Sequence, residues 1–236
     1  MTRGAALSAM FPGSGRLWVS IEGINGVGKT SAARAAAVAL GARCLLLDEL
    51  TDSAGNTLPA QVIAALGQEN DPFLRAGHPV VETLALLALQ VRKAERLAVQ
   101  DLTGVEVILE DRGVDSIAVY QAAILCAQDP GASPEPVLRH LLSSGRRWRP
   151  LPDATLLLLG DTAVCALRFA DRIGHPLATA DLRLLEQIDA LYRTIAAADP
   201  GRYVLVEVTG LSREQTAAAV QETVAALLDR RAAHAS

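Results

Sequence analysis

The chain has 236 residues, which suits one α/β domain with at most a small appendage. Half of the residues are hydrophobic but only 3% are aromatic, so the core must be built mainly from Ala, Leu, Val and Ile. The net charge of −4 argues against nucleic-acid binding through a general positive field, and no apolar run approaches the roughly 18 residues that a membrane span needs.

The two ends of the chain differ from the part between them. Residues 1–15 hold a broken apolar stretch that ends in Phe-Pro-Gly-Ser-Gly, which predicts a flexible tail rather than a secretion signal. Residues 230–236 predict a second flexible tail, so a single domain is expected over residues 16–229. The three widely spaced cysteines form no metal-binding or disulfide pattern, which favours a reducing, cytoplasmic location.

Short apolar runs alternate with helix-forming stretches along this domain. The expected strands cover residues 17–21, 44–47, 105–109, 154–159 and 203–208. The expected helices cover residues 30–40, 58–66, 80–100, 116–128, 134–143, 163–169, 178–198 and 212–231. Continuous apolar runs are typical of strands buried on both faces of a parallel sheet. The pattern predicts a three-layer α/β fold in which helices flank a five-stranded parallel sheet.

A motif with a known physical role joins the first strand to the first helix. Residues 23–30 read Gly-Ile-Asn-Gly-Val-Gly-Lys-Thr and match the phosphate-binding pattern G-x-x-x-x-G-K-[ST] at each fixed position. Such a loop points main-chain N–H groups at phosphates beside a helix N-terminus. Lys29 would reach the β- and γ-phosphates, and the Thr30 hydroxyl would reach Mg²⁺. The fold is therefore expected to be that of a P-loop NTPase, with nucleotide-binding residues Asn25, Gly26, Val27, Gly28, Lys29, Thr30 and Ser31.

Charged residues follow two other strands at the carboxyl edge of the sheet, where ligands gather in such folds. Residues 110–112 read Glu-Asp-Arg: Asp111, with Glu110 as second choice, would approach Mg²⁺, and the guanidinium of Arg112 would bind phosphate oxygens. Asp48 and Glu49 follow the second strand. The alternative in both places is a solvated acid or charge pair at a strand end.

A basic cluster, Arg146-Arg147-Trp148-Arg149, could indicate nucleic-acid binding if it were considered by itself. It precedes the fourth strand and so lies at the opposite end of the sheet from the phosphate-binding loop. Nucleic acid is therefore not expected as a partner.

Two segments together resemble the thymidylate kinase family. They are Ile-Glu-Gly-Ile-Asn-Gly-Val-Gly-Lys-Thr at 21–30 and Asp-Arg-Gly-Val-Asp-Ser-Ile-Ala-Val-Tyr-Gln at 111–121. A helix that bears Arg92 lies between these segments, and a stretch similar to the family's lid follows them, in the family's order. The resemblance implies Mg²⁺-dependent transfer of the ATP γ-phosphoryl group to a small-molecule acceptor, with a helical lid at about residues 166–180. It also implies a homodimer, for which the apolar faces of helices 80–100 and 116–128 would serve.

The resemblance implies roles for residues around the donor. Lys29 would hold the phosphates, and Thr30 and Asp111 would place the metal ion. The loop carries Val27 and no arginine, so the lid must neutralise the transferring phosphoryl group. Two lid arginines four residues apart share one helix face and are the candidates, unless that face is simply solvated: Arg168 and Arg172.

The acceptor side of the resemblance is incomplete. Arg92 and Arg112 match residues that hold the acceptor, and Tyr120 matches one that leans on its sugar, although it could equally fill the core. Four family features are missing: an Asp at the position of Asn25, an Arg within residues 48–53, a stacking ring at Ala88 and an aromatic residue at Gly113.

These departures favour an acceptor other than dTMP. Glu49 stands where related deoxynucleoside kinases carry a Glu that accepts the proton of a hydroxyl, and Asp48 would bind beside it. The expected acceptor is thus a nucleoside-like or nucleotide metabolite. The alternatives are a genuine dTMP kinase with a rearranged acceptor site and, in another class, an NTP-hydrolysing switch or a nucleotide sensor.

Overall fold

The computed structural model describes residues 16–50, 57–67, 71–75, 77–127, 129 and 131–235. Main-chain contacts divide the chain into two compact units. The helical unit includes Glu49–Asp101 and Gly113–Leu151, and the sheet unit is formed by Gly15–Asp48, Leu102–Arg112 and Pro152–Ser236. The tail expected at residues 1–15 lies outside the described residues, and the domain limits at 16 and 229 stay predictions.

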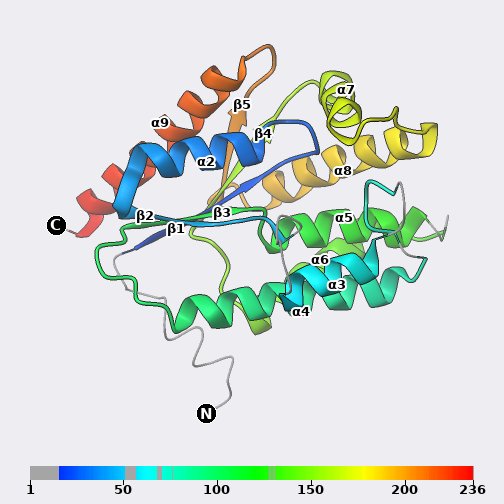
Figure 1. Ribbon diagram of the computed structural model, residues 1–236, viewed down its shortest axis with the longest axis horizontal. Helices are drawn as coiled ribbons and strands as arrows, with labels where there is room; N and C mark the ends of the chain where they lie inside the picture. The colour runs from blue at the N-terminus through cyan, green and yellow to red at the C-terminus, as the bar shows by residue number, and fades with distance from the viewer. Residues whose placement is uncertain are drawn as a thin grey trace. The chain divides into compact units, whose positions relative to one another are not determined.

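Within the described residues, the sheet unit contains five parallel strands in the order β2-β3-β1-β4-β5 (Figure 1). Their bounds are β1 (Leu17–Glu22), β2 (Cys44–Leu47), β3 (Val107–Asp111), β4 (Ala154–Leu159) and β5 (Tyr203–Glu207). The inner strands β1, β3 and β4 are buried along their whole length, which explains their continuous apolar sequences. The predicted α/β class and five-stranded parallel sheet are therefore confirmed.

The strand order places a ligand site at the centre of the sheet. From β1 the chain moves past β3 to β2, at one edge of the sheet. From β3 it moves in the opposite direction, past β1, to β4. The carboxyl ends of β1 and β3 therefore lie where the strand order reverses, which is the usual position of a ligand in an open α/β sheet.

β3 begins and ends later than the sequence predicted, because it runs over Val107–Asp111 instead of residues 105–109. The apolar run ends at Leu109, but main-chain pairing with β1 continues as far as the partners Ile21 and Asp111. Glu110 and Asp111 thus lie within the strand and are buried, rather than following it as solvated residues. The position of the last apolar residue therefore placed the end of this strand too early, because the polar residues at its end also belong to it.

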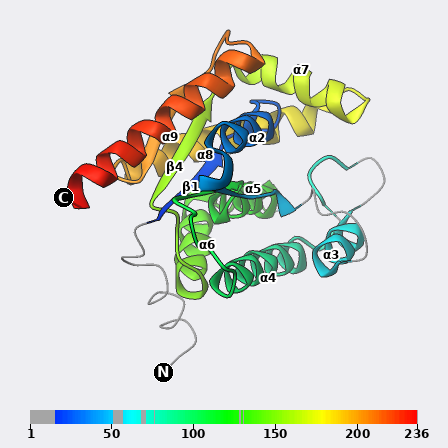
Figure 2. The same ribbon diagram turned by 60° about the vertical axis from the view of Figure 1, so that its left-hand side comes forward.

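Helices of the sheet unit pack against its strands and one another. They are α2 (Lys29–Leu40), η1 (Gly41–Arg43), α7 (Thr162–Ile173), α8 (Thr179–Ala198) and α9 (Arg213–Ala235). α2 and α9 lie side by side in both views (Figures 1 and 2), with small buried residues such as Ala32 and Ala36 on α2 and with Val220 and Val224 buried on α9. Small side chains allow two helices to approach closely.

α9 is longer than predicted, since it continues through residues that were expected to form a flexible tail. The added segment is rich in Ala and Arg, which have high helix propensity. Arg231 is also tied to the unit by an ion pair, with 3.2 Å between its Nη1 and Asp153 Oδ2. The described part of the predicted tail is therefore the end of a helix.

The helical unit is formed by helices whose buried side chains are mainly apolar, with a close approach at a glycine and a hydrogen bond between two polar side chains. Its helices are α3 (Leu58–Leu66), α4 (Pro79–Ala98), α5 (Val114–Ala127) and α6 (Pro134–Trp148). α6 approaches α5 at Gly145, where a Cβ atom would lie 2.7 Å from Val114 Cγ2. The Thr83 hydroxyl of α4 donates to Gln121 Oε1 of α5 at 2.8 Å. No helix in the described part of the chain combines the length and the hydropathy of a membrane span.

The basic cluster at residues 146–149 does not form one surface. Arg146, Arg147 and Trp148 are exposed at the end of α6, but Arg149 is only 2% exposed. Its guanidinium donates to Gln90 Oε1 and, through Nε, to the Pro150 carbonyl. The fourth member of the cluster thus serves packing within the helical unit.

Candidate active site

The loop between β1 and α2 lies against the main chain of α7. Gly26 has a φ of +82°, and a Cβ atom there would lie 2.0 Å from the carbonyl oxygen of Cys165. Both the backbone conformation and the lack of space therefore require glycine at this position. The contact fixes the start of α7 next to the phosphate-binding loop.

A pocket of about 540 Å³ opens beside this loop, and the residues that line it belong to the sheet unit. Cationic side chains predominate in its lining, against the carboxylate of Asp171. The lining residues are Gly26, Val27, Gly28, Lys29, Thr30, Ser31, Arg112, Arg168, Asp171, Arg172, Arg213 and Thr216. A pocket with this charge, at a helix N-terminus, favours a polyanion such as a triphosphate.

Lys29 begins α2 and is only 3% exposed. Its ammonium donates to the Ile24 carbonyl at 2.7 Å, so the side chain folds back along the loop. The arrangement holds a cation at the point where the loop amides and the helix dipole also favour negative charge.

Arg112 follows β3 and lines the same pocket. Its main-chain N–H donates to the Ile21 carbonyl at 3.3 Å, next to the start of the loop. Its Nη2 donates to the side-chain oxygen of Asn25. Asn25, which was predicted to bind the nucleotide, is therefore buried and placed against Arg112, and the pocket lining begins at Gly26.

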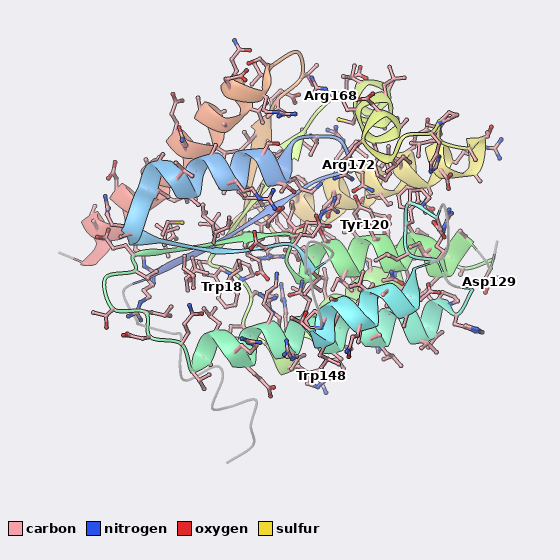
Figure 3. All side chains as sticks on the ribbon, in the orientation of Figure 1. Trp18, Tyr120, Asp129, Trp148, Arg168 and Arg172 are labelled. Atoms are coloured by element: carbon pink, nitrogen blue, oxygen red, sulfur yellow. The ribbon has the colours of Figure 1, made fainter. Side chains whose placement is uncertain are left out.

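α7 brings the two lid arginines to the pocket. Asp161 caps the start of the helix, since its Oδ1 accepts from the Val164 N–H at 2.9 Å, and Gly174 caps the end in the left-handed conformation. Arg168 and Arg172, which are labelled in Figure 3, both line the pocket, in agreement with their spacing on one helix face. The Arg172 guanidinium also lies 5.0 Å from the centre of the Phe169 ring, which is buried.

The two predicted metal-binding residues come from neighbouring segments. Thr30 lines the pocket at the start of α2. Asp111 is buried at the end of β3, level with Ile21 of β1. The described residues contain no group of three or more His, Cys, Asp or Glu side chains that could hold a metal ion by themselves. A metal ion here would take some of its ligands from phosphate oxygens and water, as Mg²⁺ usually does.

Comparison with known proteins identifies the family. No family model matches the chain. Thymidylate kinase from Cereibacter sphaeroides strain ATCC 17029 is 30% identical over 217 residues, which cover 88% of this chain and 94% of that protein. The chain belongs to the thymidylate kinase family. The enzyme of strain ATCC 17023 gives the same values.

The structural comparison agrees with this assignment. The crystal structure of thymidylate kinase from Ehrlichia chaffeensis matches with a TM-score of 0.61 and 18% identity, over 90% of this chain and 98% of that one. This likeness confirms the fold. Membership of the thymidylate kinase family makes the protein an ATP-dependent kinase.

Three pocket residues of this thymidylate kinase family member were not predicted from sequence. Asp171 lies between the two lid arginines, and Arg213 and Thr216 belong to the first turn of α9. Thr216 Cγ2 would lie 3.7 Å from a Cβ atom at Gly28, so α9 starts beside the loop. The rule that ligands gather at strand ends indicated the segment after β5, but it did not select these side chains.

Of the residues predicted for the acceptor, Arg112 lines this pocket and the others are not among its lining residues. Asp48 is exposed after β2 in the sheet unit. Glu49, Arg92 and Tyr120 are half-buried in the helical unit. The Tyr120 ring centre lies 6.4 Å from that of Phe73, a buried aromatic residue that sequence reasoning missed. Their roles stay predictions.

The cysteines have the character of packing groups. Burial raises the pKa of the thiols of Cys44, Cys126 and Cys165. At Cys165 the cations of Lys29 and Arg168 oppose this shift of the pKa without cancelling it. The Cys165 thiol is therefore protonated at neutral pH and fills space near Gly160.

Proposed function

We propose that this kinase transfers the γ-phosphoryl group of ATP, with Mg²⁺, to a nucleotide or nucleoside-like acceptor. The observation that carries the proposal is the cationic pocket built around the loop, in which Lys29, Arg112 and the α7 arginines face one space. Phosphoryl transfer depends mainly on positioning and on stabilising charge spread over phosphate oxygens. This pocket supplies both from side chains fixed by the sheet unit.

The residues present fit a magnesium ion bound together with ATP. Thr30 offers a hydroxyl oxygen in the pocket, and Asp111 offers a carboxylate beside the strand from which the loop starts. Mg²⁺ prefers oxygen ligands and commonly uses one or two protein carboxylates together with substrate phosphates. When bound, the ion would neutralise charge on the phosphates. Lys29 and the loop amides would hold the same phosphates in place.

Replacement of Arg168 or Arg172 with alanine tests the proposed lid function. We expect kcat to fall by about 10³-fold for the arginine that contacts the transferring group, since arginines in that position are worth that much elsewhere. Steady-state kinetics with saturating ATP measures the effect. Arg183→Ala on α8 is the matched control, because Arg183 is exposed and does not line the pocket. Wild-type kcat in both α7 variants would exclude the lid function.

The acceptor is proposed to be other than dTMP. Asn25 carries no charge, Ala88 is an exposed residue of α4 with no ring to stack on a base, and Glu49 could accept the proton of an acceptor hydroxyl. Loss of a stacking ring alone would weaken base binding by about 1–3 kcal/mol. The second candidate is dTMP, because the curated relatives are named thymidylate kinases.

An acceptor panel separates the candidates. The purified protein is incubated with Mg²⁺, ATP and either dTMP, other nucleoside monophosphates or free nucleosides, and ADP release is measured. We expect the fastest ADP release with an acceptor other than dTMP. Turnover of dTMP at ordinary kinase rates, about 1–100 s⁻¹, would assign the protein to dTMP instead. Release that no acceptor stimulates would favour a hydrolysing switch, and no release would favour a sensor.

A homodimer is also proposed, and exposed apolar side chains on α4 support it. Val80, Val81 and Leu84 are more than half exposed near the start of this helix. α5, the other helix predicted to take part, is buried along most of its length. The surface of α4 is therefore the better candidate for a contact between subunits.

A further inference from the structure

Arg112 is held in an unusual backbone conformation at the edge of the phosphate pocket. Its φ is +60°, in the left-handed region that residues other than glycine rarely adopt. Such conformations persist only where surrounding contacts impose them. Two contacts of Arg112 are with the segment that leads into the loop: its N–H donates to the Ile21 carbonyl, and its guanidinium donates to Asn25.

Asn25 is well placed to fix the Arg112 side chain. It is only 5% exposed and lies within the loop, directly before Gly26. A buried partner with a short side chain restricts the rotamers of a long arginine side chain far more than a solvent-exposed partner does. The hydrogen bond to Asn25 therefore restricts where the Arg112 guanidinium lies in the pocket.

The chemical nature of Asn25 matters as much as its position. An amide oxygen accepts a hydrogen bond without carrying charge, so it orients Arg112 without neutralising it. A carboxylate at the same place would make the same hydrogen bond but would form an ion pair with Arg112. The attraction of Arg112 for a phosphate would then be reduced.

We propose that Asn25 is a positioning residue whose neutral side chain holds the Arg112 guanidinium at the phosphate pocket without itself neutralising the positive charge. The inference rests on the proposed function, since it assumes that phosphates occupy the pocket. It gives Asn25 a role different from the direct nucleotide contact expected from the sequence.

A double-mutant cycle tests the positioning role. Asn25→Ala, Arg112→Ala and the double variant are compared with wild type by calorimetric binding of MgATP and of inorganic tripolyphosphate. In the presence of Arg112, we expect Asn25→Ala to weaken binding roughly tenfold, as loss of a hydrogen bond to a charged group does. In the Arg112→Ala background the same change should have almost no effect. Equal effects in both backgrounds would overturn the inference.

Asn25→Asp tests the charge argument and is close in shape to the native residue, so it keeps the test valid even if Asn25→Ala does not fold. At low salt we expect this variant to bind tripolyphosphate about tenfold more weakly than wild type, with a difference that shrinks as NaCl is raised. A purely structural role for Asn25 would give no such salt dependence. Binding equal to or tighter than wild type would overturn the inference.

The wild-type measurement separates this inference from the proposed function. If wild-type protein binds neither MgATP nor tripolyphosphate, the proposed function fails and the inference fails with it. If wild type binds both and the cycle is additive, only the role of Asn25 is overturned. Melting temperatures of the variants show that each protein is folded under the conditions of the assay.

Discussion

Replacement of Gly26 with alanine should lower kcat/KM for ATP by about 10²-fold or more, since displacements near 1 Å have that effect on catalysis. The added Cβ would lie 2.0 Å from the Cys165 carbonyl oxygen, so the loop and α7 would have to move apart. That movement would carry the α7 arginines away from the phosphates. Steady-state kinetics with ATP as the varied substrate measures the loss.

Gly104→Ala is the matched control for this substitution. Gly104 has a φ of +77°, close to that of Gly26, but nothing lies within 4 Å of its added Cβ. The Gly104→Ala variant should therefore show the effect of backbone strain alone, which costs about 1–2 kcal/mol of stability. Its kcat/KM should stay near that of wild type. Equal loss of activity in both variants would mean that strain, rather than contact between the loop and α7, explains the effect at Gly26.

Lys29→Met should lower kcat by about 10²–10³-fold, the typical cost of removing one preorganised charge or donor from a transition state. Methionine keeps the straight aliphatic chain of this buried residue but removes the ammonium that donates to the Ile24 carbonyl. The turnover number at saturating ATP, measured with the best acceptor of the panel, is the appropriate quantity.

Lys93→Met provides the comparison, because Lys29 and Lys93 are the lysines of this chain and Lys93 lies on α4, in the helical unit. We expect its turnover to stay within a few-fold of wild type. A Lys29→Met enzyme with turnover as high as that of Lys93→Met would remove Lys29 from the proposed mechanism.

The fold could be predicted well because the sheet leaves a strong local signal. Runs such as Leu-Leu-Leu-Leu in β4 are continuous since both strand faces are buried. The errors arose where local signals fail. Polar residues at the end of β3 continue the main-chain pairing, and Ala-rich α9 has no residue that ends it where the tail was expected.

The site could be predicted only in part, because most of its geometry comes from segments far apart in sequence. The loop motif identified Lys29 and Thr30, and the spacing on α7 identified both arginines. Nothing local indicates that Arg213 of α9 lines the same pocket, or that Asn25 contacts Arg112 rather than a ligand. The four consecutive basic and aromatic residues at 146–149 likewise gave no sign that Arg149 is buried.

The tight main-chain contact between Gly26 and Cys165 also restricts how α7 can move. A helix held at its first turns can tilt only about that contact. The displacement is then smallest beside the loop and largest at the other end of the helix. Gly174, in the left-handed conformation, ends the helix on the side away from the loop. For a given tilt, Arg172 would then sweep a longer arc than Arg168.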